Sequence, residues 1–151
     1  MHLVSQSPQD TGAIAARLAT TWKDALRGRS SALVVALEGE LGAGKTTLVQ
    51  GIAHALGIRE MPKSPTFNLV KEYPVPGTDL HVWHVDCYRL SGRADLAALD
   101  LHHVFADPHN LVLVEWAQRV ADALPDDHIV VCMEHAGADK RSISVNEHPK
   151  R

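Results

Sequence analysis

The sequence predicts a single α/β domain over residues 1–151, in which a mixed β-sheet is flanked by helices. A chain of 151 residues is long enough for one domain with a substantial core. Continuous apolar runs, typical of strands covered by helices on both faces, alternate along the chain with segments of helical spacing. The last two expected strands form a hairpin, so some strand pairs should be antiparallel.

Composition and charge are those of an ordinary globular protein, with 45% hydrophobic and 22% charged residues. A net charge of −3 gives no general attraction to nucleic acid, and the arginines form no basic stripe. The N-terminus does not have the pattern of a signal peptide, and the apolar runs are too short to span a membrane. Cys87 and Cys132 are isolated, as is typical of reduced thiols. We therefore expect a cytoplasmic protein that does not bind membranes.

The first expected element is a helix that begins near Pro8 and ends at Gly28. Asp10 or Thr11 is expected to cap it, because short polar side chains accept hydrogen bonds from the first free backbone N–H groups. One face of this helix is apolar at helical spacing, with Ile14, Ala15, Leu18, Ala19 and Trp22.

The remaining elements follow from apolar periodicity between breaks at glycine and proline. Residues 32–37, ALVVAL, predict a buried strand, and residues 45–56 predict a helix that Gly57 ends. Pro76 and Gly77 mark the turn between two strands. The other expected elements are strands at 68–73, 80–86 and 110–116, helical segments at 95–105 and 120–124, and a hairpin of 129–134 with 141–145.

Residues 39–46, GELGAGKT, match the P-loop pattern G-x4-G-K-[ST] in full. Glycines let such a loop turn successive backbone N–H groups toward phosphate oxygens, and the following helix adds its positive N-terminal dipole. Lys45 is expected to reach the β- and γ-phosphates while packing against little of the protein, and the Thr46 hydroxyl to bind Mg²⁺. The alternative is a glycine-rich turn that precedes a lysine by chance. The strand before the loop and the helix after it favour nucleotide binding.

A P-loop enzyme also needs a carboxylate for its metal, usually at the end of a neighbouring strand. Glu115 follows LVLV and Asp86 follows HVWHV, so parallel strands would place both at the phosphate edge of the sheet. Glu115 ends the cleaner apolar run and is the expected Mg²⁺ ligand, directly or through water. Asp86 is then expected to orient the attacking water or to contact the γ-phosphate region. For each residue, the alternative is a solvated strand end.

Four blocks, GELGAGKTT, KSPTF, HVDCYRL and LVEW, occur in this order and together resemble the TsaE (YjeE) family. The resemblance covers about residues 11–145. It implies a bacterial ATPase of the tRNA threonylcarbamoyladenosine pathway that acts with the TsaD–TsaB complex and meets tRNA only through that complex. ATP and Mg²⁺ are the implied ligands.

The resemblance also implies roles for particular residues. Thr46 and Glu115 would bind Mg²⁺. Asp86 would be an essential catalytic carboxylate, and Lys45 would also take part in catalysis. Two positions depart from the family pattern: Ala117 replaces a common proline, and Asp100 replaces an expected glycine. The residues implied around the nucleotide are Gly42, Ala43, Gly44, Lys45, Thr46, Thr47, the switch-like Ser64 and Thr66, and Trp116.

Three further groups of residues carry weaker expectations. Pro65 restricts Ser64 to extended conformations, which suits a phosphate-sensing segment with Thr66 but also suits a simple strand cap. Thr11 and Arg141 are the candidates for an adenine pocket. The ten histidines are expected to be structural or surface residues, because no cluster with metal-ligand spacing completes a site.

Several functions share the P-loop. The favoured one is an ATPase whose hydrolysis resets a partner enzyme. A small-molecule or nucleoside kinase would need a second pocket and an arginine-rich lid, and a GTPase would need an Asn-Lys-x-Asp segment, which the sequence lacks. A nucleotide-binding module without turnover is the remaining alternative. Arg89 is expected to contact a phosphate or a partner, or to form a surface salt bridge.

Overall fold

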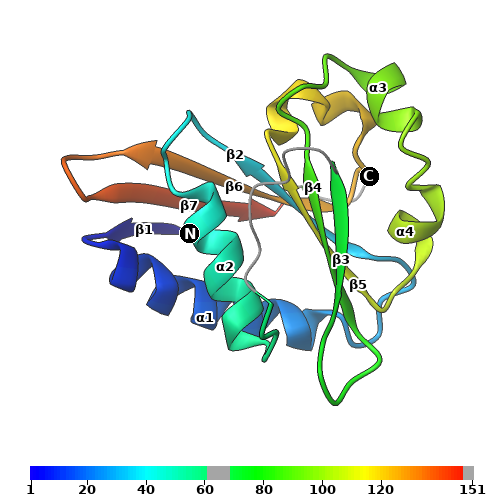
Figure 1. Cartoon of the computed structure of the whole chain (residues 1–151), viewed down its shortest axis with the longest axis horizontal. Helices are drawn as coiled ribbons and strands as arrows, with labels where there is room; N and C mark the ends of the chain where they lie inside the picture. Colours follow the sequence, from blue (N-terminus) through cyan, green and yellow to red (C-terminus); the bar gives the residue numbers. More distant parts are fainter. Residues whose placement is uncertain (61–68, 148–151) are drawn as a thin grey trace.

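The computed structural model describes residues 1–60 and 69–147, which form a seven-stranded sheet with helices on both faces (Figure 1). The strand order is β1-β7-β6-β2-β5-β4-β3. The elements are β1 (His2–Ser5), α1 (Pro8–Ala25), β2 (Leu33–Glu38), α2 (Lys45–Ala55), β3 (Val70–Pro74), β4 (His81–Asp86), α3 (Arg93–Ala97), α4 (His102–Ala106), β5 (Asn110–Glu115), β6 (His128–His135) and β7 (Arg141–Glu147), with 3₁₀ turns at Ala117–Arg119 and Ala121–Ala123.

The centre of the sheet is parallel and its edges are antiparallel. β2 pairs in parallel with β5 and β6, and β4 pairs in parallel with β5. β3, β7 and β1 are added antiparallel to β4, β6 and β7, respectively. The predicted α/β class with a mixed sheet is therefore confirmed. Because β2, β5 and β4 run in the same direction, their carboxyl ends meet at one edge.

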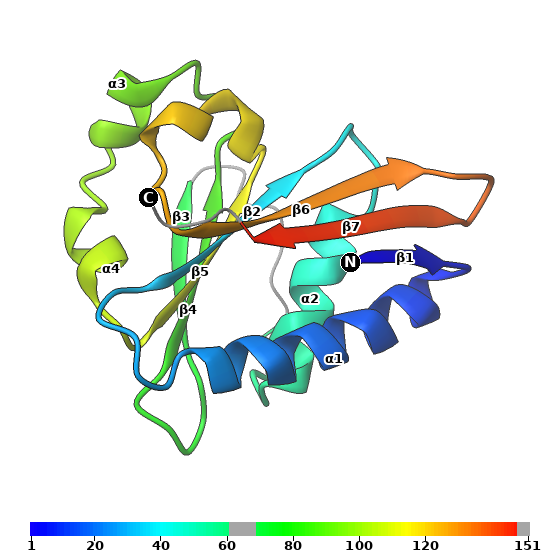
Figure 2. The ribbon, with the colours of Figure 1, turned by 180° about the vertical axis from the view of Figure 1, so that it is seen from behind.

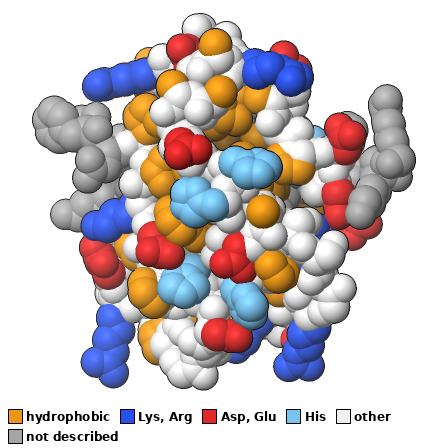
Figure 3. Space-filling view, turned by 90° about the vertical axis from the view of Figure 1, so that its right-hand side faces the viewer, with side chains coloured by type: hydrophobic (Ala, Val, Ile, Leu, Met, Phe, Trp, Pro, Cys, Tyr) orange, Lys and Arg blue, Asp and Glu red, His pale blue; other side chains and the backbone are white. Residues whose placement is uncertain are grey.

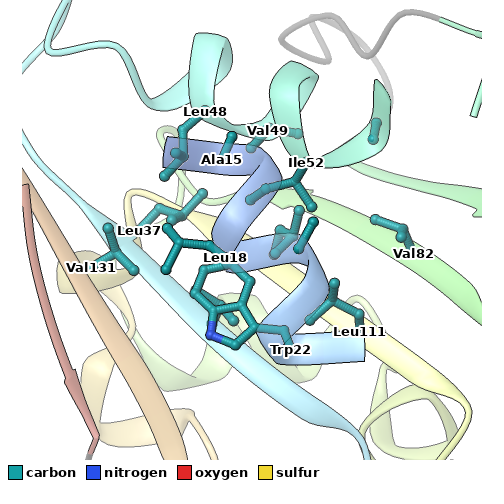
Figure 4. Close-up of a cluster of buried hydrophobic side chains, with 14 of the residues drawn as sticks. Ala15, Leu18, Trp22, Leu37, Leu48, Val49, Ile52, Val82, Leu111 and Val131 are labelled. Atoms are coloured by element: carbon teal, nitrogen blue, oxygen red, sulfur yellow. The ribbon is translucent and has the colours of Figure 1, made fainter. Parts of the chain in front are cut away.

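α1 and α2 cover one face of the sheet, and their apolar side chains meet those of the strands in one cluster (Figure 4). The two helices approach closely at Gly51, where an added Cβ would lie 2.6 Å from the Cβ of Ala15. The cluster includes Leu18, Trp22, Leu37, Leu48, Val49, Ile52, Leu111 and Val131. This packing fixes α2, and with it the loop that precedes α2, against the sheet.

The opposite face is covered by shorter elements, namely α3, α4 and the 3₁₀ turns (Figure 2). The predicted helical segment at 95–105 is two short helices, because Asp100 between them has φ 52° in the left-handed region. This is the position at which the family resemblance implies a glycine. The helix expected at 120–124 is instead a 3₁₀ turn at Ala121–Ala123, which follows another 3₁₀ turn at Ala117–Arg119.

The ends of α1 differ from the prediction. Its N-cap is Ser7, whose Oγ accepts a hydrogen bond from the Asp10 backbone N–H at 3.1 Å. The Asp10 carboxylate instead accepts from the Gln6 N–H, and Thr11 lies inside the helix, so neither is the cap. The helix ends at Ala25 rather than at Gly28.

β1 was not expected from the sequence. It has only four residues, of which Ser5 alone is buried, and it pairs with β7 at the edge of the sheet. Within the described part of the chain, no helix combines the length and the apolar character needed to cross a bilayer.

Candidate functional site

The loop between β2 and α2 has the backbone shape that its glycines allow. Gly39 has φ 152°, and a Cβ there would collide with the Met133 carbonyl oxygen. Gly44, with φ 102°, is the N-cap of α2 and has no side chain to cap the helix. The first N–H groups of α2 are therefore left for another acceptor, and a helix N-terminus of this kind favours an anion.

Lys45, the first residue of α2, points back into the loop. Its Nζ donates to the carbonyl oxygens of Gly39 at 2.6 Å and Glu40 at 3.0 Å, and it lies 4.2 Å from the centroid of the Trp116 ring. The residue is only 5% exposed, so the expectation that it packs against little is wrong. Burial lowers the pKa of the amino group, while nearby carboxylates act in the opposite direction. The loop carbonyls thus use two of the three N–H donors of the ammonium group, which leaves one for a bound phosphate.

Thr46 and two carboxylates meet at the carboxyl ends of the strands. The Thr46 hydroxyl donates to Oε1 of Glu115 at 3.4 Å, and Asp86 lies directly opposite Glu115 in the register of β4 and β5. Both carboxylates are buried. Oδ1 of Asp86 accepts from the Tyr88 backbone N–H at 2.9 Å, which orients this carboxylate. The predicted juxtaposition of the P-loop with both strand ends is therefore present.

The donor set at this edge suits Mg²⁺. A hydroxyl and a carboxylate oxygen are hard ligands, and Mg²⁺ is typically held by one or two carboxylates together with substrate phosphates. No group of three or more His, Cys, Asp or Glu residues within residues 1–60 and 69–147 could hold a metal ion alone. Thr46 and Glu115 would thus need phosphate oxygens or water to complete the coordination.

An aromatic and cationic cluster borders the loop. Trp116 follows β5 with φ 57°, and its ring makes an edge contact with Tyr88 at 5.0 Å between centroids. The Arg119 guanidinium lies 5.3 Å from both ring centroids. Sequence reasoning did not identify Tyr88 or Arg119. The available signal for Arg119 was its position three residues after Trp116, which a tight turn brings back to that ring.

The two adenine-pocket candidates lie near the loop. Thr11 and Arg141 line a small pocket of about 50 Å³ together with Gly44 and Thr47. Arg141 also donates to the Gly42 carbonyl oxygen at 3.3 Å. The structure therefore brings Thr11, Thr47 and Arg141 together, and their contact with a base stays a prediction.

Other predicted residues fall into different positions. Ala43 is buried within the loop, whereas Ser64 and Thr66 lie outside the described residues. Arg89 is exposed and forms no ion pair within the described part of the chain. Cys87 and Cys132 are free thiols, and burial raises the pKa of both, that of Cys87 to about 12.

The histidines among the described residues divide into surface and buried groups. Figure 3 shows histidines beside acidic side chains on the side of the molecule that carries α3 and α4 in Figure 1. His81 pairs with Glu72, and His109 pairs with Asp79 and Asp107. His84 is different, because it is fully buried and hydrogen-bonds to Glu115. The sequence predicted only structural or surface histidines and did not connect His84 with the metal carboxylate.

The comparison with protein families decides how this site is classified. The family model described as threonylcarbamoyl adenosine biosynthesis protein TsaE matches residues 5–143. The chain belongs to the TsaE family. Family membership supports the coarser part of the predicted function, a role in tRNA threonylcarbamoyladenosine biosynthesis.

Individual relatives of the TsaE family agree with this assignment. The chain is 39% identical over 111 residues to the TsaE protein of Bacillus subtilis, covering 74% of this chain and 67% of the relative. It is 35% identical over 145 residues to that of Treponema pallidum, covering 96% and 99%. The crystal structure of Bacillus subtilis YdiB superposes with a TM-score of 0.75 at 31% identity, covering 99% of this chain and 86% of that chain.

Proposed function

We propose that this protein is a Mg²⁺-dependent ATPase that acts on or resets the TsaD–TsaB complex during formation of threonylcarbamoyladenosine in tRNA. The observation that carries the proposal is the meeting of Lys45, Thr46 and Glu115 at the mouth of a complete P-loop. The TsaE membership supports the pathway, and the P-loop chemistry supports the reaction.

Each residue in the site has a separate task in this proposal. The backbone N–H groups of residues 42–47 would surround the phosphates, and the Lys45 ammonium would contact their β- and γ-oxygens. Thr46 and Glu115 would hold Mg²⁺, which neutralises charge on the phosphate oxygens when bound.

Asp86 is the proposed base for the attacking water. Its buried carboxylate lies beside Glu115 and is oriented by the Tyr88 N–H. It would accept a hydrogen bond from the water and fix the direction of attack on the γ-phosphate. Orienting the water stabilises the transition state of hydrolysis and not the bound nucleotide. The loss of Asp86 should therefore affect turnover more than nucleotide binding.

Phosphate release tests this function directly. ATP and GTP are supplied in parallel, with and without Mg²⁺, to the protein alone and mixed with TsaD and TsaB. We expect Mg²⁺-dependent release from ATP that increases with the partners. Binding without release in every mixture would indicate a nucleotide-binding module, and loss of ATP without free phosphate would indicate a kinase.

A further inference from the structure

His84 is buried at the base of the proposed metal site. It is 0% exposed and lies in β4 on the same face as Val82 and Asp86. Its Nε2 hydrogen-bonds to Oε2 of Glu115 in the adjacent strand. An ionised carboxylate only accepts hydrogen bonds, so the ring donates through an Nε2–H group.

The two oxygens of Glu115 are used differently. Oε2 accepts from His84, whereas Oε1 accepts from the Thr46 hydroxyl at 3.4 Å. Oε2 is thus held by a side chain of the neighbouring strand β4, and Oε1 faces the start of α2. Rotation of the carboxylate would require breaking the buried hydrogen bond to His84, which costs free energy because neither group would then be solvated.

Packing alone does not account for a histidine at this position. Its neighbours on the same face include Val82 and Leu113, which are apolar and fully buried. The Nδ1 atom is buried and has no hydrogen-bond partner among residues 1–60 and 69–147. An aliphatic side chain would avoid that cost, so the contact with Glu115 is the interaction that an imidazole provides here.

We propose that His84 is a positioning residue for Mg²⁺, which acts by holding Glu115 with Oε1 directed toward Thr46. This inference rests on the proposed Mg²⁺-ATP function. Outer-shell partners of metal ligands orient the ligand, and their loss typically lowers metal affinity by about 10–100-fold. His84 itself does not contact the metal in this arrangement.

Two substitutions of similar polarity separate positioning from packing. His84→Gln places an amide N–H group near the position of Nε2, whereas His84→Asn reaches only to about the position of Nδ1. Nucleotide binding is followed with a fluorescent ATP analogue over a range of Mg²⁺ concentrations and without Mg²⁺, and urea unfolding reports stability. We expect His84→Asn to raise the Mg²⁺ requirement about tenfold or more, with Mg²⁺-free binding unchanged, and His84→Gln to restore most of it.

Glu115→Ala supplies the matched background. If His84 acts through Glu115, adding His84→Asn to Glu115→Ala should not raise the Mg²⁺ requirement further. A wild-type Mg²⁺ requirement in His84→Asn, or equal losses in both His84 variants, would overturn the positioning role. If the affinity of the wild-type protein for the nucleotide does not change with Mg²⁺ concentration, that result would instead contradict the proposed function itself.

Discussion

At the scale of single residues, Lys45 serves both the proposed chemistry and the local packing. Its ammonium group takes the loop carbonyls of Gly39 and Glu40 as acceptors, and the Trp116 ring lies on it. These contacts resemble those that a phosphate would make, because they also place electron-rich groups around the ammonium. The residue is therefore held near the expected position of the phosphates before any nucleotide binds.

We predict that Lys45→Ala removes most ATP turnover and also destabilises the fold by about 1 kcal/mol, the typical value of a lost hydrogen bond. Lys45→Met is the matched control, because it keeps the apolar stem beside Trp116 but lacks the charge. It also lacks the hydrogen bonds to the loop carbonyls, so we expect it to recover only the part of the stability that comes from packing of the stem, and none of the turnover. Phosphate release and urea unfolding measure the two effects. Turnover by the Met variant would show that the ammonium group is not required.

The two carboxylates allow a second residue-scale prediction. Glu115→Ala should impair Mg²⁺-dependent nucleotide binding, because Glu115 is the carboxylate in contact with Thr46. Asp86→Ala should spare binding and stop hydrolysis, because a base that orients water acts in the transition state. Nucleotide titration with Mg²⁺ and single-turnover hydrolysis distinguish the variants. If Asp86→Ala loses binding and Glu115→Ala keeps it, the two roles are reversed.

At the scale of secondary-structure elements, the parts that sequence predicted best are those with strong local signals. The strand, P-loop and helix around Gly44 follow from a motif whose spacing fixes its geometry. β1 has no such signal, because a four-residue edge strand depends on its partner β7. The helix expected at 95–105 is interrupted at Asp100, whose left-handed backbone the apolar pattern does not reveal.

Contacts between elements were harder to predict than the elements themselves. Asp86 and Glu115 were expected at one edge because parallel strands end together. The bond from His84 to Glu115 requires the register of β4 on β5, which no single segment contains. The burial of Lys45 requires the turn at Trp116, where a non-glycine residue takes a positive φ.

The contact between α1 and α2 gives a prediction at this scale. A Cβ at Gly51 would lie 2.6 Å from the Cβ of Ala15, so Gly51→Ala should force the helices apart. We expect a loss of about 1–3 kcal/mol, as for other overpacked cores. Gly12→Ala in α1 is the control, since its added Cβ meets nothing within 4 Å. It should be neutral or stabilising by up to about 1 kcal/mol. Similar urea midpoints for both variants would contradict this account.

At the scale of the whole molecule, the proposed site lies at the edge of the sheet where the carboxyl ends of β2, β5 and β4 meet. The loop tip is exposed at Leu41, and Tyr88 is exposed beside the aromatic and cationic cluster. Arg119 is the arginine within that cluster, and its guanidinium stacks on Tyr88 and Trp116. Because its guanidinium contacts both rings in this position, Arg119 is not free to extend to a phosphate as an arginine finger does. The molecule alone should therefore stabilise the transferring phosphoryl group incompletely.

We predict slow ATP hydrolysis by the protein alone and faster hydrolysis with TsaD and TsaB. A missing arginine contact is worth ~10³–10⁵ in rate, which leaves room for a large stimulation. The partner complex is expected to hold residues 63–67, which include Ser64 and Thr66, against the γ-phosphate, so Ser64→Ala and Thr66→Ala should reduce the stimulation. Arg119→Ala serves as the comparison and should leave the ratio of stimulated to basal turnover unchanged. Steady-state phosphate release measures all of these rates.

Equal turnover with and without the partners, with both hydroxyl variants unaffected, would exclude a switch completed by the partner. If Arg119→Ala is the only variant that loses the stimulation, the missing cationic contact with the phosphoryl group comes from Arg119 of this chain.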